Sequence, residues 1–86
     1  MELSDWRRRI DALNDQLLAL LNERATCALA IAEVKKKKML PVLDTDRERQ
    51  VIESVLAKNR GPLSNDSVRR IFESIIAEHR LLEESH

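Results

Sequence analysis

The chain has 86 residues, of which 43% are hydrophobic and 35% charged, and its fifteen basic residues balance fifteen acidic ones. This length suits one small domain spanning residues 1–86, and the balanced charge gives no general attraction to nucleic acid or to a membrane. A lone cysteine and the lack of any long apolar run exclude an internal disulfide, a membrane span and a secretory signal, so we expect a soluble cytoplasmic protein.

The composition favours helices over strands. Leu, Ala, Glu, Arg and Lys are common, whereas the chain has a single Gly, one Trp, one Phe and no Tyr. No segment alternates β-branched and polar residues between turn signals, as a strand would. We therefore expect an all-α fold, and the positions of the Pro and Gly residues that interrupt it predict three helices.

The first predicted helix is very long. Ser4 is a plausible N-cap, and from there the pattern continues without Gly or Pro to about Lys38, before Pro41 interrupts it. Some 35 residues at about 1.5 Å each give a rod of roughly 50 Å. Apolar residues recur along it at heptad spacing, in the two series Ile10, Leu17, Ile31 and Leu13, Leu20, Cys27, Val34.

The two later helices are too short to cover this rod. Thr45 and Glu48 fit a capping box at the start of the second helix, and Gly61 follows its end. Ser64 or Asn65 could cap the third helix. Helices of about 14 and 20 residues leave much of the heptad seam exposed, so the sequence predicts a homodimer in which the long helices pair.

One heptad position is Arg24, a side chain that is costly to bury without a negative partner. It could set the register of the paired helices or meet a Glu of the other chain, or it could bind an anion in a cavity. Lys35 shares its face about three turns later, roughly 16 Å along the axis. The two side chains could therefore bracket one small polar molecule, although Lys35 could also belong to a solvated lysine run.

Arg7 lies near the start of the same helix, roughly 25 Å from Arg24 along the axis. Within one chain the two residues cannot contact the same small ligand. They could do so if the paired helices run antiparallel and the partner subunit supplies Arg7.

The segment "DTDRER" places several charges at the start of the second helix. Carboxylates suit the positive end of the helix dipole, so capping alone could account for Glu48, whereas a cation such as Arg47 is unfavourable there and is harder to explain structurally. In the third helix, His79 and Glu83 lie one turn apart. Two such residues do not make a metal site, so we expect no metal.

Taken in order, "RRRIDALNDQLLALLNER", "AIAEVKKKK", "PVLDTDRERQVI" and "VRRIFESIIAEHRLLE" resemble the all-helical chorismate mutases over essentially the whole chain. The resemblance implies an intertwined homodimer of three-helix chains, with active sites lined by both chains and without a cofactor. It also implies the shikimate-pathway reaction for aromatic amino acids, in which chorismate rearranges to prephenate.

By this resemblance, Arg24 and the partner's Arg7 would clamp the two carboxylates of chorismate. Lys35 would hydrogen-bond the ether oxygen and a neighbouring carboxylate, and Arg47 would support the carboxylate end. Asp44 and Glu48 would address the ring hydroxyl. The expected apolar walls are Ala28, Ile31, Val51 and Ile76.

Two positions depart from the family pattern. Glu83 replaces the usual Gln that donates to the ether oxygen, and His79 stands where a Ser is often found near a carboxylate. A carboxyl group donates only when protonated, and Glu ordinarily titrates near about pH 4.3. We therefore expect activity to rise toward acid pH.

The implied reaction is an intramolecular Claisen rearrangement that needs no nucleophile, metal or general base. Two alternatives remain open at this point. An isochorismate-pyruvate lyase of the same fold would use a similar set of cations, and a non-catalytic helical dimerisation or regulatory module would use Arg24 and Glu48 structurally.

Overall fold

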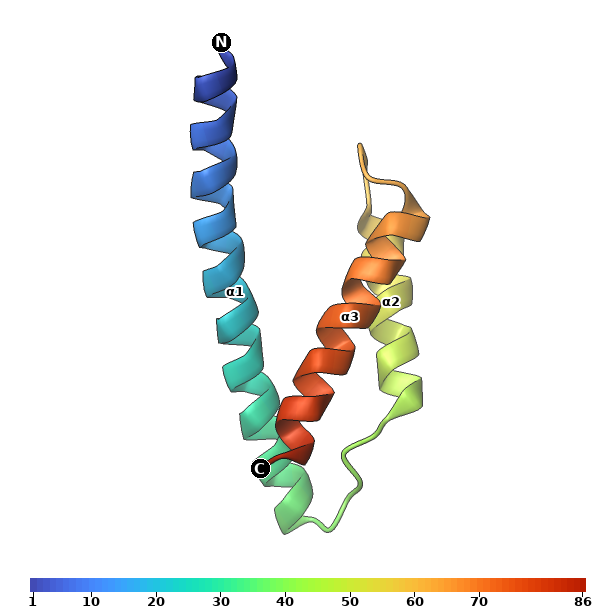
Figure 1. Ribbon diagram of the computed structural model, residues 1–86. Helices are drawn as coiled ribbons and strands as arrows, with labels where there is room; N and C mark the ends of the chain where they lie inside the picture. The colour runs from blue at the N-terminus through green and yellow to red at the C-terminus, as the bar shows by residue number, and fades with distance from the viewer.

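All regular structure in the computed structural model, which describes residues 1–86, is helical. Helix α1 spans Leu3–Lys37, α2 spans Thr45–Lys58 and α3 spans Asn65–Glu84. Helix α3 packs against both α1 and α2, whereas α1 and α2 do not pack directly against each other (Figure 1). The prediction of three helices, one of them very long, is confirmed.

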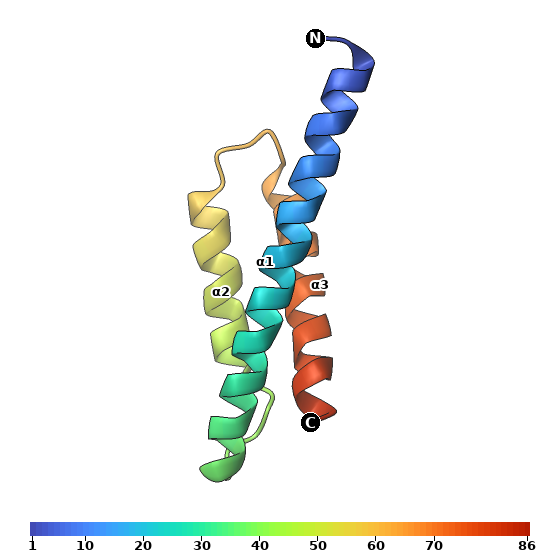
Figure 2. The same cartoon turned by 90° about the vertical axis from the view of Figure 1, so that its left-hand side faces the viewer.

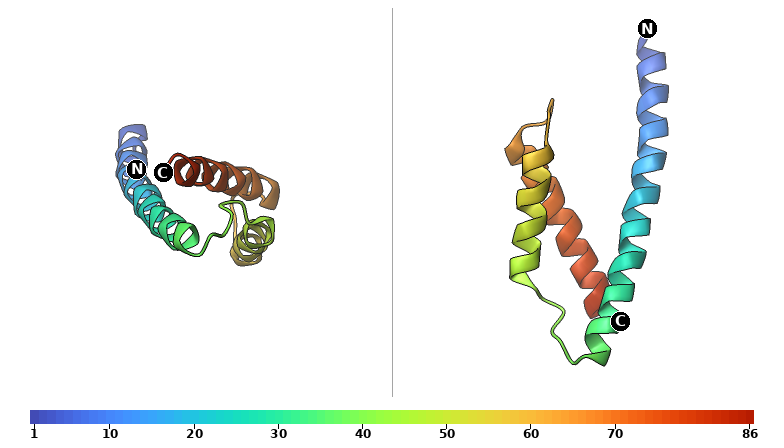
Figure 3. Two further views of the ribbon diagram at one scale, coloured as in Figure 1. Left: turned by 90° about the horizontal axis from the view of Figure 1, so that it is seen from below. Right: turned by 180° about the vertical axis from the view of Figure 1, so that it is seen from behind.

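The chain by itself is elongated. It measures 55 × 24 × 15 Å and has a radius of gyration of 15.9 Å, compared with about 12 Å for a compact chain of this length. The N-terminal end of α1 projects beyond the other two helices (Figures 1 and 2). Helices α2 and α3 lie together on one side of α1 (Figure 3), and α3 approaches α1 toward the C-terminal ends of both helices (Figure 1).

Helix α1 begins before the predicted cap. Ser4 lies inside the helix, and the N-cap is Glu2, whose backbone N–H donates to Oδ2 of Asp5 at 2.8 Å. The predicted cap at Ser4 is therefore wrong, because the Asp5 carboxylate satisfies the helix end two residues earlier.

The end of α1 is a Schellman-type turn. The backbone N–H of Met39 donates to the carbonyl of Lys36, and that of Leu40 donates to the carbonyl of Lys35. Met39 occupies the left-handed region with a φ of 57°, the conformation such a turn requires and one that Gly more often supplies. The turn sends the chain back along α1 and brings Val42 close to Lys35.

The predicted capping box of α2 is also wrong. The N-cap is Asp44, whose Oδ1 accepts from the backbone N–H of Arg47 at 3.0 Å. Thr45 is the first residue of the helix. Since Asp44 satisfies the helix end, Glu48 is available for another contact.

A short polar connection joins α2 to α3. The Asn59 side chain donates to the carbonyl of Leu63 and to Oδ1 of Asn65, and it accepts from the backbone N–H of Gly61. Gly61 has a φ of 75°, which a side chain would disfavour. Ser64 then caps α3 by accepting from the backbone N–H of Ser67 at 3.1 Å, which confirms one of the two predicted caps.

The buried core of the single chain is small. One residue from each helix is buried, namely Ala28, Ile52 and Val68. The apolar heptad residues of α1, in contrast, are between 50% and 62% exposed. They are Ile10, Leu13, Leu17, Leu20, Ile31 and Val34. The chain alone therefore leaves the predicted seam uncovered.

None of the three helices combines the length and apolarity that crossing a membrane would require.

Candidate active site

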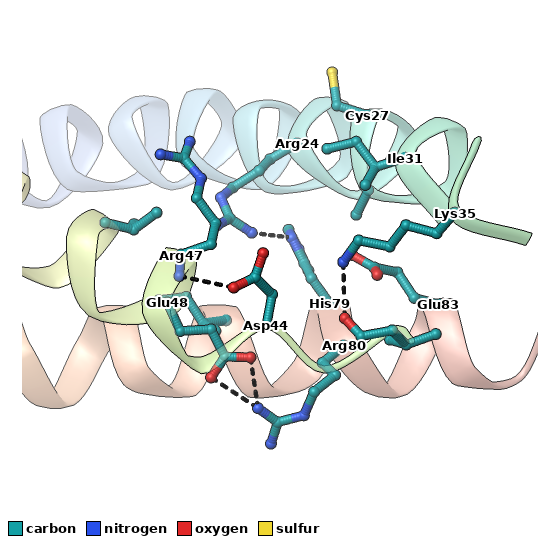
Figure 4. Close-up of a pocket in the computed structure, with 14 residues that line it drawn as sticks. Arg24, Cys27, Ile31, Lys35, Asp44, Arg47, Glu48, His79, Arg80 and Glu83 are labelled. Atoms are coloured by element: carbon teal, nitrogen blue, oxygen red, sulfur yellow. Dashed lines mark hydrogen bonds and ion pairs between the residues drawn. The ribbon is translucent and has the colours of Figure 1, made fainter. Parts of the chain in front are cut away.

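A pocket of about 410 Å³ opens where α3 crosses the C-terminal half of α1 and faces the start of α2 (Figure 4). This volume falls within the range typical of small-molecule sites. The side chains that line it come from all three helices and from the loop before α2. They are Arg24, Cys27, Ala28, Ile31, Lys35, Val42, Asp44, Arg47, Glu48, Val51, Ile76, His79, Arg80 and Glu83.

The structure thus brings together all of the predicted site residues except Arg7, and also all four predicted apolar wall residues. Arg7 is exposed near the free end of α1. Its distance from Arg24 along the helix, roughly 25 Å, keeps it out of the pocket of its own chain. That a partner subunit brings Arg7 to the pocket remains a prediction.

Arg24 contacts the imidazole of His79, which ties α1 to α3. Nη1 of Arg24 lies 2.6 Å from Nδ1 of His79. Because a guanidinium can only donate, Nδ1 must accept, and the proton of the neutral imidazole is on Nε2. Arg24 is therefore held in place by a neutral group and retains its full positive charge.

Burial lowers the pKa of His79 below its ordinary value of 6.5, and the adjacent Arg24 charge lowers it further. Glu83 and Glu78, on the same helix as His79, oppose this effect. The net direction favours the neutral imidazole, which agrees with the role of Nδ1 as acceptor.

Lys35 is held at the other end of the pocket by the backbone. Its Nζ donates to the carbonyl of Val42 at 2.7 Å, and the side chain is half-buried. This contact depends on the turn after α1, and a main-chain acceptor cannot be read from a side-chain motif. Lys35, like Arg24, therefore has a neutral partner.

Asp44 and Arg47 belong to the first turn of α2. The Asp44 carboxylate caps the helix through the backbone N–H of Arg47, so Asp44 has a structural role in addition to the ligand role expected from the resemblance. Both side chains line the pocket, and the cap fixes the orientation of the turn that carries them.

Glu48 makes a contact that the sequence reading missed. Nη1 of Arg80 donates to both of its carboxylate oxygens, at 2.9 and 2.8 Å. This hydrogen bond and the Glu48 charge raise the pKa of the Arg80 guanidinium above its ordinary value. One available signal was that Arg80 lies one turn after Ile76, a predicted wall residue, and so shares its face of α3.

Glu83 completes the pocket on α3. It is half-buried and lines the same cavity as Lys35. In all, four cationic and three acidic side chains line the pocket, together with the neutral His79. No group of three or more His, Cys, Asp or Glu side chains is arranged to bind a metal ion.

The pKa of His79 predicts a pH dependence of stability. Since folding lowers this pKa, the unfolded chain binds the proton more tightly, and stability should fall as pH drops through about 6.5 toward the folded value. His79→Gln keeps a hydrogen-bond acceptor for Arg24 but does not titrate. We expect its Tm to fall less than that of the wild type between about pH 8 and about pH 5.5.

His86 offers a matched control, because it lies at the exposed C-terminus. The His86→Gln variant should show the wild-type fall in Tm when all three proteins are measured at one chain concentration. An equal fall in His79→Gln and wild type would contradict the assignment.

The chain is similar to known proteins of one family. Residues 6–84 match the chorismate mutase type II family. The chain is 38% identical, over 88 aligned positions, to the bifunctional chorismate mutase/prephenate dehydratase of Pseudomonas aeruginosa, and the match covers 96% of this chain and 24% of that protein. The chain thus spans about a quarter of the length of the bifunctional relatives it matches.

Single-domain proteins are similar over nearly their whole length. The chorismate mutase of Methanocaldococcus jannaschii is 26% identical, with 99% of this chain and 87% of that protein covered. A structure of chorismate mutase from Thermus thermophilus, form II, superimposes with a TM-score of 0.94 at 29% identity, covering 95% of this chain and 93% of that one. The resemblance predicted from the motifs is confirmed, and the chain belongs to the chorismate mutase type II family.

Proposed function

We propose that this chain is a chorismate mutase that converts chorismate to prephenate, and that it acts as a homodimer. The observation that carries the proposal is the state of the cations in the pocket. Arg24 and Lys35 are positioned by an imidazole nitrogen and a backbone carbonyl, not by carboxylates. Their charges are therefore available to a ligand that is itself a dianion.

Cations fixed on rigid helices suit a reaction that depends on conformation. In the rearrangement a carbon–oxygen bond breaks and a carbon–carbon bond forms within one molecule, so no proton or co-reactant is required. The substrate must be held in a compact geometry with its reacting carbons close together. Arg24 can grip one carboxylate and resist its rotation, since a planar guanidinium binds carboxylates in a fixed orientation.

Lys35 would act on the bond that breaks. Negative charge develops on the ether oxygen in the transition state, and a cation already oriented there stabilises it more than it stabilises the ground state. The Val42 carbonyl accepts only one of the three Nζ hydrogens. The remaining donors are free for the ether oxygen and a neighbouring carboxylate.

The uncovered seam of α1 supports the homodimer. Its apolar heptad residues are at least half exposed in the single chain, and a second copy carries the same surface. Antiparallel pairing of two α1 helices would bury both seams and bring the partner's Arg7 toward Arg24. This pairing would add a further cation, from the partner subunit, to those that face the dianion.

The first test is the consumption of chorismate by the purified protein, followed by its absorbance, with prephenate identified as the product. Lys35→Ala should lower kcat at least about a hundredfold, because loss of one oriented donor commonly costs about 3–4 kcal/mol of transition-state stabilisation. We expect a similar loss of kcat/KM for Arg24→Ala. Lys37→Ala, which removes an exposed lysine of the same run, is the control.

Near-normal turnover by Lys35→Ala would exclude its proposed role. If wild-type protein left chorismate unchanged but released pyruvate from isochorismate, the lyase reading would replace the mutase. A folded protein inactive on both substrates would instead support a non-catalytic module.

A shared site predicts complementation between inactive variants. Arg7→Ala and Arg24→Ala homodimers would each lack one clamp residue in both sites. In a mixed dimer, one site would keep both arginines and the other would lose both. Re-equilibrating equal amounts should therefore restore about a quarter of wild-type activity.

Arg9→Ala, mixed with Arg24→Ala in the same way, controls for the mixing itself, since it should leave the clamp intact. No recovery from the Arg7→Ala and Arg24→Ala mixture, despite demonstrated exchange of chains, would rule out a site shared in this manner.

Glu83 predicts a pH-dependent rate. Its carboxylate can only accept a hydrogen bond, whereas its acid form can donate to the ether oxygen. We expect turnover to rise toward acid pH in the wild type. Glu83→Gln supplies a donor at every pH, so it should be faster at neutral pH and should flatten the profile. A wild-type profile without a pH trend would discard this role for Glu83.

A further inference from the structure

Arg80 lies outside the predicted set of site residues, yet it holds one member of that set. Its Nη1 donates to both carboxylate oxygens of Glu48, and the pair joins α3 to α2 across the pocket wall. The two side chains are 31% and 29% exposed. In Figure 4 the guanidinium of Arg80 and the carboxylate of Glu48 face one another, and each is the nearest charged partner of the other.

The surroundings of Glu48 explain why a partner is needed. Arg47 precedes it in α2, and Arg24 lines the same pocket. A carboxylate without a partner of its own would be drawn toward these guanidinium groups, which the substrate carboxylates require. Arg80 draws the Glu48 carboxylate to α3 instead and neutralises its charge, which would otherwise repel a dianion.

The pairing leaves Glu48 able to bind a ligand. A carboxylate offers about four lone-pair sites, and the two hydrogen bonds from Arg80 use one on each oxygen. A hydroxyl group in the pocket can therefore donate to Glu48 while the pair remains intact.

Helix α3 divides these tasks between neighbouring residues. Successive residues of a helix point in directions about 100° apart, so His79 reaches α1 while Arg80 reaches α2. Glu84, one turn after Arg80, lies 3.9 Å from its Nε and adds a second, more distant acidic group on the same helix.

We propose that Arg80 is a positioning residue, which fixes and neutralises Glu48 so that its carboxylate accepts a hydrogen bond from the ring hydroxyl of the substrate. This inference rests on the proposed function, because the hydroxyl is that of chorismate. In this role Arg80 acts through Glu48 and not through a contact with the substrate. Its effect should therefore depend on both Glu48 and the hydroxyl.

The test compares two substrates, chorismate and its analogue in which hydrogen replaces the ring hydroxyl. Arg80→Met should lower kcat/KM for chorismate at least about tenfold, the scale of one charged hydrogen bond. On the analogue the loss should be clearly smaller, because only the repulsion between the unpaired Glu48 carboxylate and the dianion remains. Arg70→Met, which removes an exposed arginine of the same helix, should match wild type on both substrates.

A double-mutant cycle checks that the effect passes through Glu48. In the Glu48→Gln background, adding Arg80→Met should cause little further loss of kcat/KM, because the carboxylate to be positioned is already absent. The double variant also leaves no unpaired carboxylate, so it keeps the inference testable if Arg80→Met fails to fold. Arg80→Lys should recover part of the activity of Arg80→Met on chorismate.

The outcomes separate this inference from the proposed function. Equal losses on the two substrates, or additive losses in the cycle, would overturn the positioning role. An active wild type with a normal Arg80→Met variant would overturn this inference alone. A wild type that leaves chorismate unchanged would overturn the proposed function and this inference together.

Discussion

The length of α1 constrains everything else in this molecule. A helix of 35 residues with an apolar stripe along it cannot be covered by α3, the one helix that packs against it, toward its C-terminal end. The same mismatch that leaves the stripe exposed also leaves room for a pocket where α3 diverges from α1. The single chain is therefore elongated and has three buried residues, which is the ground on which a homodimer is proposed.

Within the pocket, the structure separates cations that are neutralised from cations that are available. Arg80 is paired with Glu48, whereas Arg24 and Lys35 contact neutral acceptors. A neutral acceptor restricts a long side chain without cancelling its charge. The cost of ordering these side chains is thus met by folding, before any ligand arrives, which is what preorganisation requires.

The three helices could be predicted from the sequence, because heptad spacing and turn residues depend on local geometry, whereas the set of pocket residues came from the resemblance to the chorismate mutases. The helix ends were less predictable, since Asp44 and Glu2 compete with neighbouring residues for the same caps. The contacts of His79 and Arg80 were not predictable, because they depend on how α3 crosses the other two helices. The hydrogen bond from Lys35 to Val42 requires the left-handed turn at Met39, a conformation that the sequence signals weakly without a Gly.

The two positions that depart from the family pattern, His79 and Glu83, both affect the charge of the pocket. His79 supplies the nitrogen that accepts from Arg24, and the lowered pKa of His79 favours the neutral imidazole. Glu83 adds a carboxyl group to a pocket that already holds Asp44 and Glu48. A protonated imidazole could no longer accept from Arg24, so the low pKa of His79 keeps this cation oriented for the ligand. The charge that a dianion meets is thus set by cations that the backbone and α3 hold in place.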